Sequence, residues 1–186
     1  REETDYYVIY NKNFKNRKAY KKRLRSDFFS RKGGRISEYD PIIKIYADSI
    51  GWDWRLLASL IYQESKWDPE TESWAGALGL MQIMPLHVEN CGIDDFIDPE
   101  QNIRCGSNYL KTLERYYTDI QDDEERLKFI LASYNAGPNH VKDAQRLAEK
   151  YGSDPHVWTG SVDEFILKKA DPDYYNDEVV KYGYCR

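Results

Sequence analysis

Apolar side chains recur at every third or fourth position along most of the chain after residue 36, which is the spacing of amphipathic helices. The strict alternation that marks a half-buried strand is not sustained anywhere in the sequence. The periodicity predicts helices over residues 41–50, 52–67, 80–90, 99–117, 124–134, 138–151 and 157–168. We therefore expect a mainly α fold, with at most a small β hairpin near the glycine-rich or C-terminal stretches.

Capping and breaking residues indicate where some of these helices begin and end. Asp40 precedes Pro41, so we expect the aspartate to be the N-cap of the first helix and the proline to be its first residue. Gly51 is expected to end that helix. The run from Asn135 to Pro138 predicts a break between two later helices.

One carboxyl group continues an apolar stripe in the helix expected over residues 52–67. The residues spaced at i, i+3, i+4 and i+7 there are Leu57, Leu60, Ile61 and Glu64. Burial disfavours the charged form of a carboxyl group, so we expect the pKa of Glu64 to be raised, as a general acid requires. Periodicity alone also allows Glu64 to turn to solvent or to cap a backbone group at the helix end.

A loop rich in proline, serine and glycine follows this acid and leads through a glycine turn to an amide side chain. This first motif consists of Glu64-Ser65, Ser73, Gly76-Ala77 and Gly79-Leu80-Met81-Gln82. A second consists of Asp98-Pro99, Asn102-Ile103, Gly106 and Tyr109-Leu110, and a third is Ala132-Ser133-Tyr134-Asn135-Ala136-Gly137. In this order the motifs resemble the signature of the family 1 lytic transglycosylases, lysozyme-like enzymes that cleave the glycan of the bacterial cell wall.

The resemblance implies a lysozyme-like helical fold and a mechanism with a single acid. Glu64 would protonate the oxygen of the β-1,4 bond between N-acetylmuramic acid and N-acetylglucosamine and then, as a base, accept the proton of the muramic acid O6. The product would be a 1,6-anhydro sugar. Glycosidases normally use two carboxyl groups. The nearby Asp68, Glu70 and Glu72 are expected to be solvated loop residues.

The same resemblance implies substrate-binding roles for Ser73, Met81, Gln82, Tyr134 and Asn135. It implies that Ser73 hydrogen-bonds the N-acetyl group, and that Met81 and Gln82 line the groove, where an amide offers both a donor and an acceptor. Tyr134 and Asn135 would approach the acid. The plainer interpretations are a loop or N-cap serine, a methionine that fills the core, a tyrosine at a helix end and an asparagine that caps it.

Three further residues near these motifs carry no assigned role. Trp67 and Trp74 lie on the loop after the acid, where they either stack on sugar faces or pack within the protein. Ser133 stands where the family usually has alanine, a small change that we expect the fold to accept.

The C-terminal tail narrows the resemblance. Tyr182-Gly183-Tyr184-x-Arg186, together with Asp53-Trp54-Arg55-Leu56-Leu57-Ala58, is most similar to the catalytic module of the F-type membrane-bound lytic transglycosylases. That group couples this module to an amino-terminal domain resembling solute-binding proteins, at the outer membrane. The resemblance therefore implies that residues 1–36 are a basic connector from an absent domain, and that residues 37–186 are a catalytic domain with a truncated C-terminal end. It also implies a periplasmic location.

Charge is divided unevenly along the chain. Residues 1–35 hold 12 Lys and Arg against 4 Asp and Glu, a net +8, and the other 151 residues hold 15 against 28, a net −13, which sum to −5. For residues 12–35 we favour a solvated linker or a short helix packed on the acidic remainder of the chain, with contact to anionic lipid head groups or polyanionic envelope material as the alternative. Nucleic acid is not expected as a partner, because no nucleic-acid-binding motif accompanies these charges. The expected partner is peptidoglycan, any membrane association would come from parts outside this chain, and a monomer is expected.

Neither a metal nor a cofactor is expected. The chain has three cysteines and three histidines, Cys91, Cys105, Cys185, His87, His140 and His156. They show no C-x-x-C or H-E-x-x-H spacing. We expect Cys91 and Cys105 to be buried free thiols, and a disulfide between them is the alternative in an oxidising compartment.

Length and composition limit the remaining choices. The 186 residues suit one domain, with or without an appendage, and 41% hydrophobic and 15% aromatic content indicates a globular chain. No apolar run approaches the roughly 20 residues of a membrane span. Two other functions stay open. One is a muramidase or chitin-type hydrolase on the same scaffold, in which Glu64 activates water, and the other is a glycan-binding module without catalysis.

Overall fold

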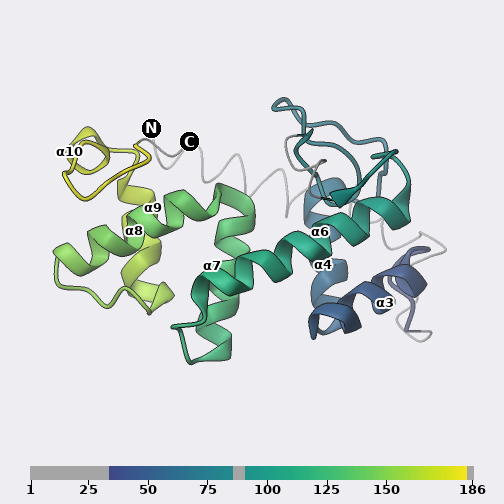
Figure 1. The fold of residues 1–186 in the computed structure, drawn as a ribbon, viewed down its shortest axis with the longest axis horizontal. Helices are drawn as coiled ribbons and strands as arrows, with labels where there is room; N and C mark the ends of the chain where they lie inside the picture. The colour runs from purple at the N-terminus through teal and green to yellow at the C-terminus, as the bar shows by residue number, and fades with distance from the viewer. Residues whose placement is uncertain (1–33, 86–90, 184–186) are drawn as a thin grey trace, which may run out of the picture. The chain divides into compact units, whose positions relative to one another are not determined.

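The computed structural model describes residues 34–85 and 91–183, and the regular secondary structure of these residues is almost entirely helical (Figure 1). The helices are α3 (Asp40–Ile50), α4 (Trp54–Ser65), α6 (Pro99–Glu114), α7 (Asp123–Ala136), α8 (Pro138–Lys150), α9 (Asp163–Lys168) and α10 (Pro172–Tyr175). Two short turns accompany them, the 3-10 turn η3 (Arg115–Tyr117) and the π-type turn η4 (Trp158–Val162). Within the described ranges, β structure is limited to isolated bridges, so the prediction of a mainly α fold is confirmed.

The described residues divide into two compact units, and the division falls within α6 between Arg104 and Cys105. The first unit contains α3, α4, the loop of residues 66–98 and the first turns of α6. The second contains the remainder of α6 and the elements from η3 to α10.

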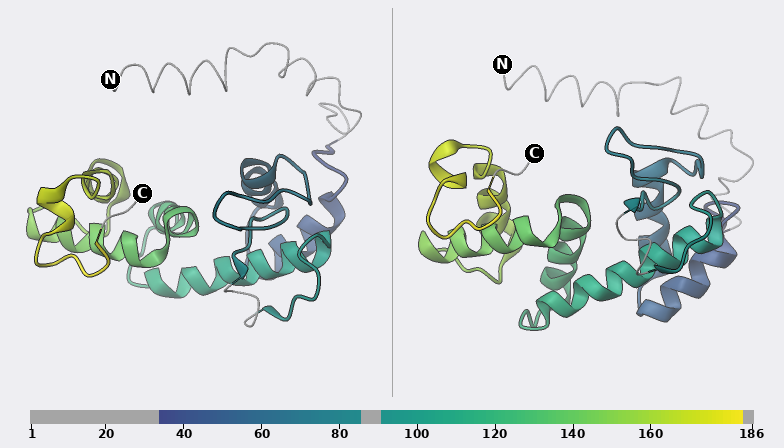
Figure 2. Two further views of the ribbon diagram at one scale, coloured as in Figure 1. Left: turned by 90° about the horizontal axis from the view of Figure 1, so that it is seen from above. Right: turned by 45° about the horizontal axis from the view of Figure 1, so that its top comes forward.

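In the first unit, α3 packs against α4 (Figure 2). The apolar faces predicted from the spacing are buried, with Ile43 and Ala47 on one helix and Leu57 and Ile61 on the other. Burying an aliphatic side chain of this size contributes about 1.5–3 kcal/mol, so these faces hold the two helices together. Their packing fixes the helix that carries Glu64.

The start of α3 differs by one residue from the prediction. Tyr39 is its N-cap and Asp40 is its first residue, so Asp40 is not the cap. The carboxylate of Asp40 instead accepts hydrogen bonds from the backbone N–H groups of Ile36 and Ser37, each at 2.8 Å. Gly51 ends the helix in the left-handed region with φ 73°, as predicted.

In the second unit, α7, α8, α9 and η4 pack on one another around Phe129, Leu147, Val162 and Phe165. Ser133 lies fully buried on α7, and its Oγ shares a hydrogen bond with the hydroxyl of Tyr117. Burial raises the pKa of Tyr117 to about 12. The buried hydroxyl of Ser133 therefore has a polar partner, as buried polar groups require.

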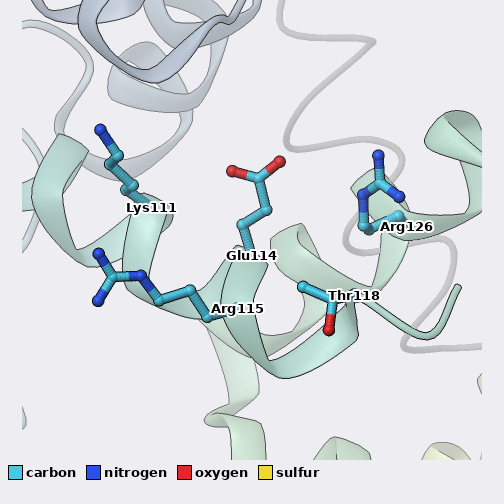
Figure 3. A pocket seen from close by; sticks show the side chains of 5 residues that line it. All are labelled: Lys111, Glu114, Arg115, Thr118 and Arg126. Carbon is cyan, nitrogen blue, oxygen red and sulfur yellow. The ribbon is translucent and has the colours of Figure 1, made fainter.

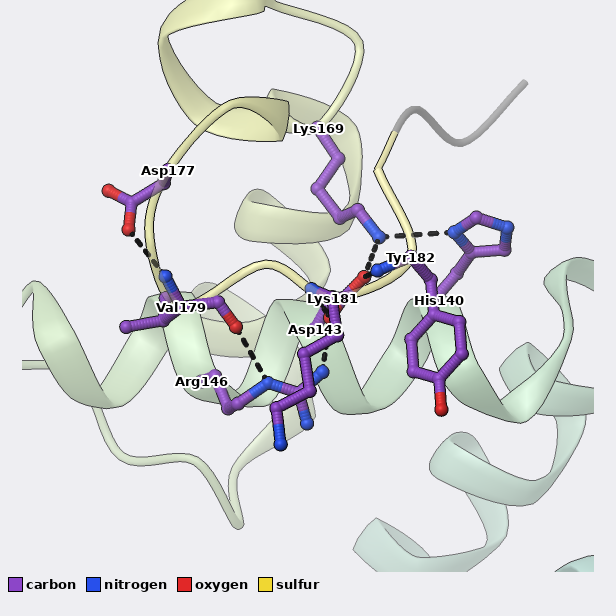
Figure 4. Close-up of polar contacts among 8 residues, drawn as sticks. All are labelled: His140, Asp143, Arg146, Lys169, Asp177, Val179, Lys181 and Tyr182. Atoms are coloured by element: carbon purple, nitrogen blue, oxygen red, sulfur yellow. Dashed lines mark hydrogen bonds and ion pairs between the residues drawn. The ribbon is translucent and has the colours of Figure 1, made fainter.

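A buried charge cluster fixes the C-terminal segment to α8 (Figure 4). Asp143 and Lys169 are both 0% exposed, and the Lys169 Nζ donates to Asp143 Oδ2 at 2.8 Å. The backbone N–H groups of Lys181 and Tyr182 also donate to the Asp143 carboxylate, at 2.8 and 2.9 Å. Arg146 forms an ion pair with Asp143 and donates to the carbonyl of Val179 at 2.8 Å. The first residue of the tail motif, Tyr182, is thus held in place by Asp143.

Most other helix predictions are confirmed, with four differences. The helix expected over residues 157–168 is interrupted, because Thr159 and Gly160 have non-helical backbone angles, and α9 covers only its second half. The segment 99–117 is helical as predicted, through α6 and then η3. The helix expected from Leu80 is wrong over residues 80–83, which form a turn and a β-bridge, and residues 86–90 of that prediction lie outside the described residues. Helix α7 continues to Ala136 and ends at Gly137, so Asn135 lies inside the helix and does not cap it. The short α10 was not expected.

The expectation of free thiols at Cys91 and Cys105 is wrong. Both residues are disulfide-bonded, and because the chain has only three cysteines and each forms one such bond, they are bonded to each other. Closing a loop of this length contributes about 3 kcal/mol in the chain-entropy model. Cysteine spacing alone could not decide between a buried thiol and this bond.

Candidate active site

Glu64 lies in the last turn of α4, at the edge of its buried face. Leu57 and Ile61 are fully buried, whereas Glu64 is half-buried. The helix ends directly after it, because Lys66 adopts the left-handed conformation with φ 58° and donates its N–H to the carbonyl of Tyr62 at 3.0 Å. The predicted stripe therefore brings the carboxyl group to the border between core and solvent.

The pKa of Glu64 is raised above the ordinary value of a glutamate. Burial is the main cause, and the nearby Lys66 ammonium group opposes it by favouring the charged form. Among the residues that the structure describes, none forms a hydrogen bond or an ion pair with the Glu64 carboxyl group. The prediction of a raised pKa is confirmed in direction, and the group is suited to hold a proton.

The loop after Glu64 returns on itself through paired backbone hydrogen bonds. Leu78 and Ile83 exchange N–H to O=C bonds of 3.0 and 2.9 Å, and Leu78 also bridges to Glu72. Gly79 donates its N–H to the carbonyl of Thr71 at 3.0 Å. These bonds fix residues 71–83 as a compact meander that carries Ser73, Met81 and Gln82.

Gly79 and Asn102 lock this meander to the start of α6. Gly79 has φ 78°, and a Cβ there would lie 2.2 Å from Asn102 Nδ2 and 2.4 Å from the carbonyl oxygen of Phe96. Asn102 is 0% exposed, donates to the carbonyls of Leu78 and Phe96 at 3.1 and 3.0 Å, and accepts from the N–H of Met81 at 2.8 Å. Only glycine fits beside this amide, and Asn102 is a positioning residue to which the sequence assigned no role. The sequence did offer one signal for this role, because the polar Asn102 comes directly before Ile103, which is buried on the same helix.

Gln82 uses its amide hydrogens within the protein. Its Nε2 donates to the carbonyls of Thr71 and Gly79 at 3.0 and 2.9 Å, and its backbone has φ 49°, which a residue other than glycine rarely adopts. Both partners are acceptors, so the orientation of the amide is defined. Both amide hydrogens are thus used within the protein and Oε1 is the acceptor that remains, while a role of Gln82 in substrate binding stays a prediction.

The other two predicted residues on the meander differ in exposure. Ser73 is half-buried, and its Oγ accepts the N–H of Ala77 at 2.9 Å, a bond that does not use its hydroxyl hydrogen. Met81 is 0% exposed, as expected of a residue that fills the core. The acidic loop residues Asp68, Glu70 and Glu72 are exposed, as predicted.

Tyr134 and Asn135 lie in the second unit, in the last turns of α7. Tyr134 is half-buried, with its ring centroid 5.7 Å from that of Tyr109, and Asn135 is exposed. Gly137 ends the helix with φ 90°, and its N–H donates to the carbonyl of Ser133 at 2.9 Å. The break predicted here thus falls at Gly137.

A separate hollow of about 410 Å³ lies in the second unit and contains none of the predicted site residues (Figure 3). Its lining residues are Lys111, Glu114, Arg115, Thr118 and Arg126. Arg126 donates to the carbonyl of Ile120 at 2.7 Å and pairs with Asp123, and the Glu114 carboxylate lies among the cations. In the part of the chain that the structure describes, no cluster of three or more His, Cys, Asp or Glu could hold a metal ion.

Comparison with known proteins places this acid and loop in a defined class. Residues 41–157 match the family described as "Transglycosylase SLT domain", and this stretch includes Glu64, the meander and the α7 motif. The chain therefore belongs to the transglycosylase SLT domain family.

Two relatives with the same name are similar to most of this chain. The chain is 43% identical over 152 residues to membrane-bound lytic murein transglycosylase F of Desulfosudis oleivorans, covering 82% of this chain and 33% of that protein. The protein of the same name from Maricaulis maris is 40% identical over 159 residues, covering 86% and 34%. The chain thus spans about a third of the length of these relatives.

Two solved structures are similar in part. The 70 kDa soluble lytic transglycosylase of Escherichia coli shares 30% identity with a TM-score of 0.45 and covers 55% of this chain and 17% of that one. An inactive variant of lytic transglycosylase Slt from Pseudomonas aeruginosa shares 22% identity with a TM-score of 0.47, covering 78% and 26%.

Proposed function

We propose that this chain carries the catalytic domain of a peptidoglycan lytic transglycosylase. The observation that supports this most directly is Glu64, a half-buried carboxyl group with a raised pKa and no charge partner among the described residues, in a member of the transglycosylase SLT domain family. The relatives described above are named lytic murein transglycosylases, which agrees with a cell-wall glycan as substrate.

In this proposal Glu64 acts first as an acid and then as a base. It donates its proton to the bridging oxygen while the bond from that oxygen to C1 of N-acetylmuramic acid breaks, and the N-acetyl group stabilises the oxocarbenium-like centre. The ionised Glu64 then accepts the proton of the muramic acid O6 as O6 bonds to C1. The proton count is restored, a 1,6-anhydro ring is formed, and no water is consumed.

The remaining site residues take roles that their contacts support. Ser73 would donate its hydroxyl hydrogen to the N-acetyl carbonyl, and the Gln82 Oε1 would accept from a sugar hydroxyl or amide. Met81 would support the groove from beneath, since it is buried. For Tyr134 and Asn135, the support is the sequence motif and the exposure of Asn135.

The proposed setting is the periplasm of a bacterial cell, in association with the outer membrane. The relatives are named as membrane-bound, and none of the described helices is long and apolar enough to cross a bilayer. We propose that residues 1–36 connect residues 37–186 to a further domain, and that the catalytic domain acts as a monomer. Residues 1–33 of this connector lie outside the described residues.

Digestion of purified sacculi tests the reaction. Mass spectrometry of the soluble products is expected to find muropeptides that end in 1,6-anhydro-N-acetylmuramic acid. Products with reducing ends alone would instead identify a hydrolytic muramidase in which Glu64 activates water. Binding of sacculi without any product, unchanged in Glu64→Gln, would identify a glycan-binding module.

A further inference from the structure

The two tryptophans on the loop after Glu64 have different surroundings. The ring of Trp67 lies 6.5 Å from that of Tyr39 and 5.9 Å from that of Tyr62, so Trp67 packs within the first unit. Trp74 is 90% exposed. Trp67 therefore has a structural role. The side chain of Trp74 faces solvent, so packing within the protein does not explain it.

The backbone on either side of Trp74 is held in a closed turn. The backbone N–H of Ser73 donates to the carbonyl of Ala77 at 2.9 Å, and the Ser73 Oγ accepts the N–H of Ala77 at 2.9 Å. The N–H of Gly76 donates to the carbonyl of Ser73 at 2.9 Å, and Gly76 has φ 82°. Below the turn, Glu72 bridges to Leu78. Trp74 thus sits at the tip of an ordered turn that leaves its indole in water.

An indole exposed in this way gains free energy when a ligand covers it. Apolar surface gains roughly 25 cal/mol per Å² on leaving water, and tryptophan is the side chain with the largest such surface. A single exposed apolar residue is common on protein surfaces, but a large aromatic on a preordered turn loses little conformational entropy when it binds. Sugar rings present flat C–H faces, and these suit the electron-rich face of an indole.

We propose that Trp74 is a stacking platform for one sugar ring of the bound glycan strand. The inference rests on the proposed function and adds a substrate contact to the same loop, one residue from Ser73. In this role Trp74 contacts a sugar ring and not the reacting atoms, so it acts on substrate binding. Its loss is expected to raise KM more than it lowers kcat, because a contact made equally in ground state and transition state affects binding alone.

Binding is measured first, in a Glu64→Gln background that cannot turn over. The ligand is glycan strands freed of their stem peptides. Trp74→Ala is expected to weaken binding about tenfold, which corresponds to the loss of one good contact. Trp74→Phe, which keeps a flat ring, is expected to restore most of the affinity. The matched control is Ile45→Ala, since Ile45 is 64% exposed on α3 of the same unit and is expected to leave affinity unchanged.

Fluorescence gives an independent readout. The difference between the emission of the parent and that of Trp74→Phe isolates this indole from the other four tryptophans. That difference is expected to shift to the blue on adding glycan, because the ring leaves water. Trp74→Ala binding within twofold of the parent, or a difference spectrum that glycan does not change, would overturn the stacking role.

The outcomes separate this inference from the proposed function. Anhydro products from sacculi together with unchanged affinity in Trp74→Ala refute only the stacking role. Trp74-dependent binding without any product refutes only the catalytic proposal. Sedimentation distinguishes a self-association surface, because Trp74→Ala would then alter the sedimentation coefficient and leave glycan affinity as it was, which also overturns the stacking role.

Discussion

Glu64 and Asp143 are two carboxyl groups withdrawn from water on helices of different units, and their pKa values move in opposite directions. For Glu64 burial raises the pKa, and only the nearby Lys66 opposes it. For Asp143 burial also acts to raise the pKa, but hydrogen bonds from Lys169, from two backbone N–H groups and from Arg146 outweigh it and lower the pKa. Burial has the same sign at both sites, so the hydrogen-bond donors decide the direction in which the pKa moves.

The opposite pKa shifts suit two different roles of a carboxyl group, as a proton donor and as an anchor for a chain segment. An acid that must give up a proton needs a site without strong donors, because each donor would stabilise the charged form. A carboxylate that fixes a chain segment needs the charge and the donors together, as Asp143 has where it holds residues 181 and 182. The following variants test this contrast, from the largest expected effect to the smallest.

Glu64→Gln replaces the carboxyl group by an amide of nearly the same shape, which has no acidic proton to donate. Activity on sacculi is expected to fall by about 10²–10⁴-fold, the range associated with general acid–base catalysis. Release of soluble muropeptides measures it. Glu70→Gln is the matched control, because Glu70 is exposed on the loop that follows the acid, and it is expected to keep activity within twofold. Equal activity of the two variants would refute the role of Glu64.

Asp143→Asn leaves the buried Lys169 ammonium group without its counter-charge. The free energy of unfolding is expected to fall by about 3–5 kcal/mol, as is typical when one partner of a buried ion pair is removed. Denaturant titration measures it. Glu164→Gln breaks the exposed pair with Lys168 and is expected to cost less than about 0.5 kcal/mol. Adding Lys169→Met to Asp143→Asn should recover part of the loss, and no recovery would argue against the ion pair as the cause.

Asn102→Ala removes the amide that locks the meander. It leaves two carbonyls and the N–H of Met81 without their partner, so the expected loss is about 2–3 kcal/mol. Activity should fall with it, because Ser73 and Gln82 lie on the meander. Asn108→Ala is the control on an exposed position of α6, and a similar loss in that variant would count against the lock.

The pH dependence should differ in sign between the two acids. The proton of Glu64 is lost as the pH rises through its raised pKa, so activity is expected to fall there, and Lys66→Asn should move this fall to higher pH because Lys66 lowers the pKa. Stability supported by Asp143 is present above the ordinary aspartate pKa and is lost as the pH falls through its lowered one. Rate profiles and thermal unfolding against pH measure these effects. A downward shift in Lys66→Asn would contradict the account.

The sequence by itself determined the helices, the glycine-marked ends and the position of one acid at the end of an apolar stripe. It could do so because periodicity and capping are properties of neighbouring residues. The helices that begin near Trp54, Pro99 and Pro138 and the break at Gly137 follow from such local patterns. The raised pKa of Glu64 could also be predicted in direction, since it depends mainly on burial.

Only the tertiary structure decided which partner each polar side chain has. Asn102 bonds Met81 across 21 positions, and Asp143 receives the N–H of Tyr182 across 39, so no local pattern contains these pairs. The same holds for the donors of Gln82, for the disulfide and for the separation of a packed Trp67 from an exposed Trp74. Hydrogen bonds and burial depend on atoms brought together from distant parts of the chain, whereas helix formation depends on those nearby.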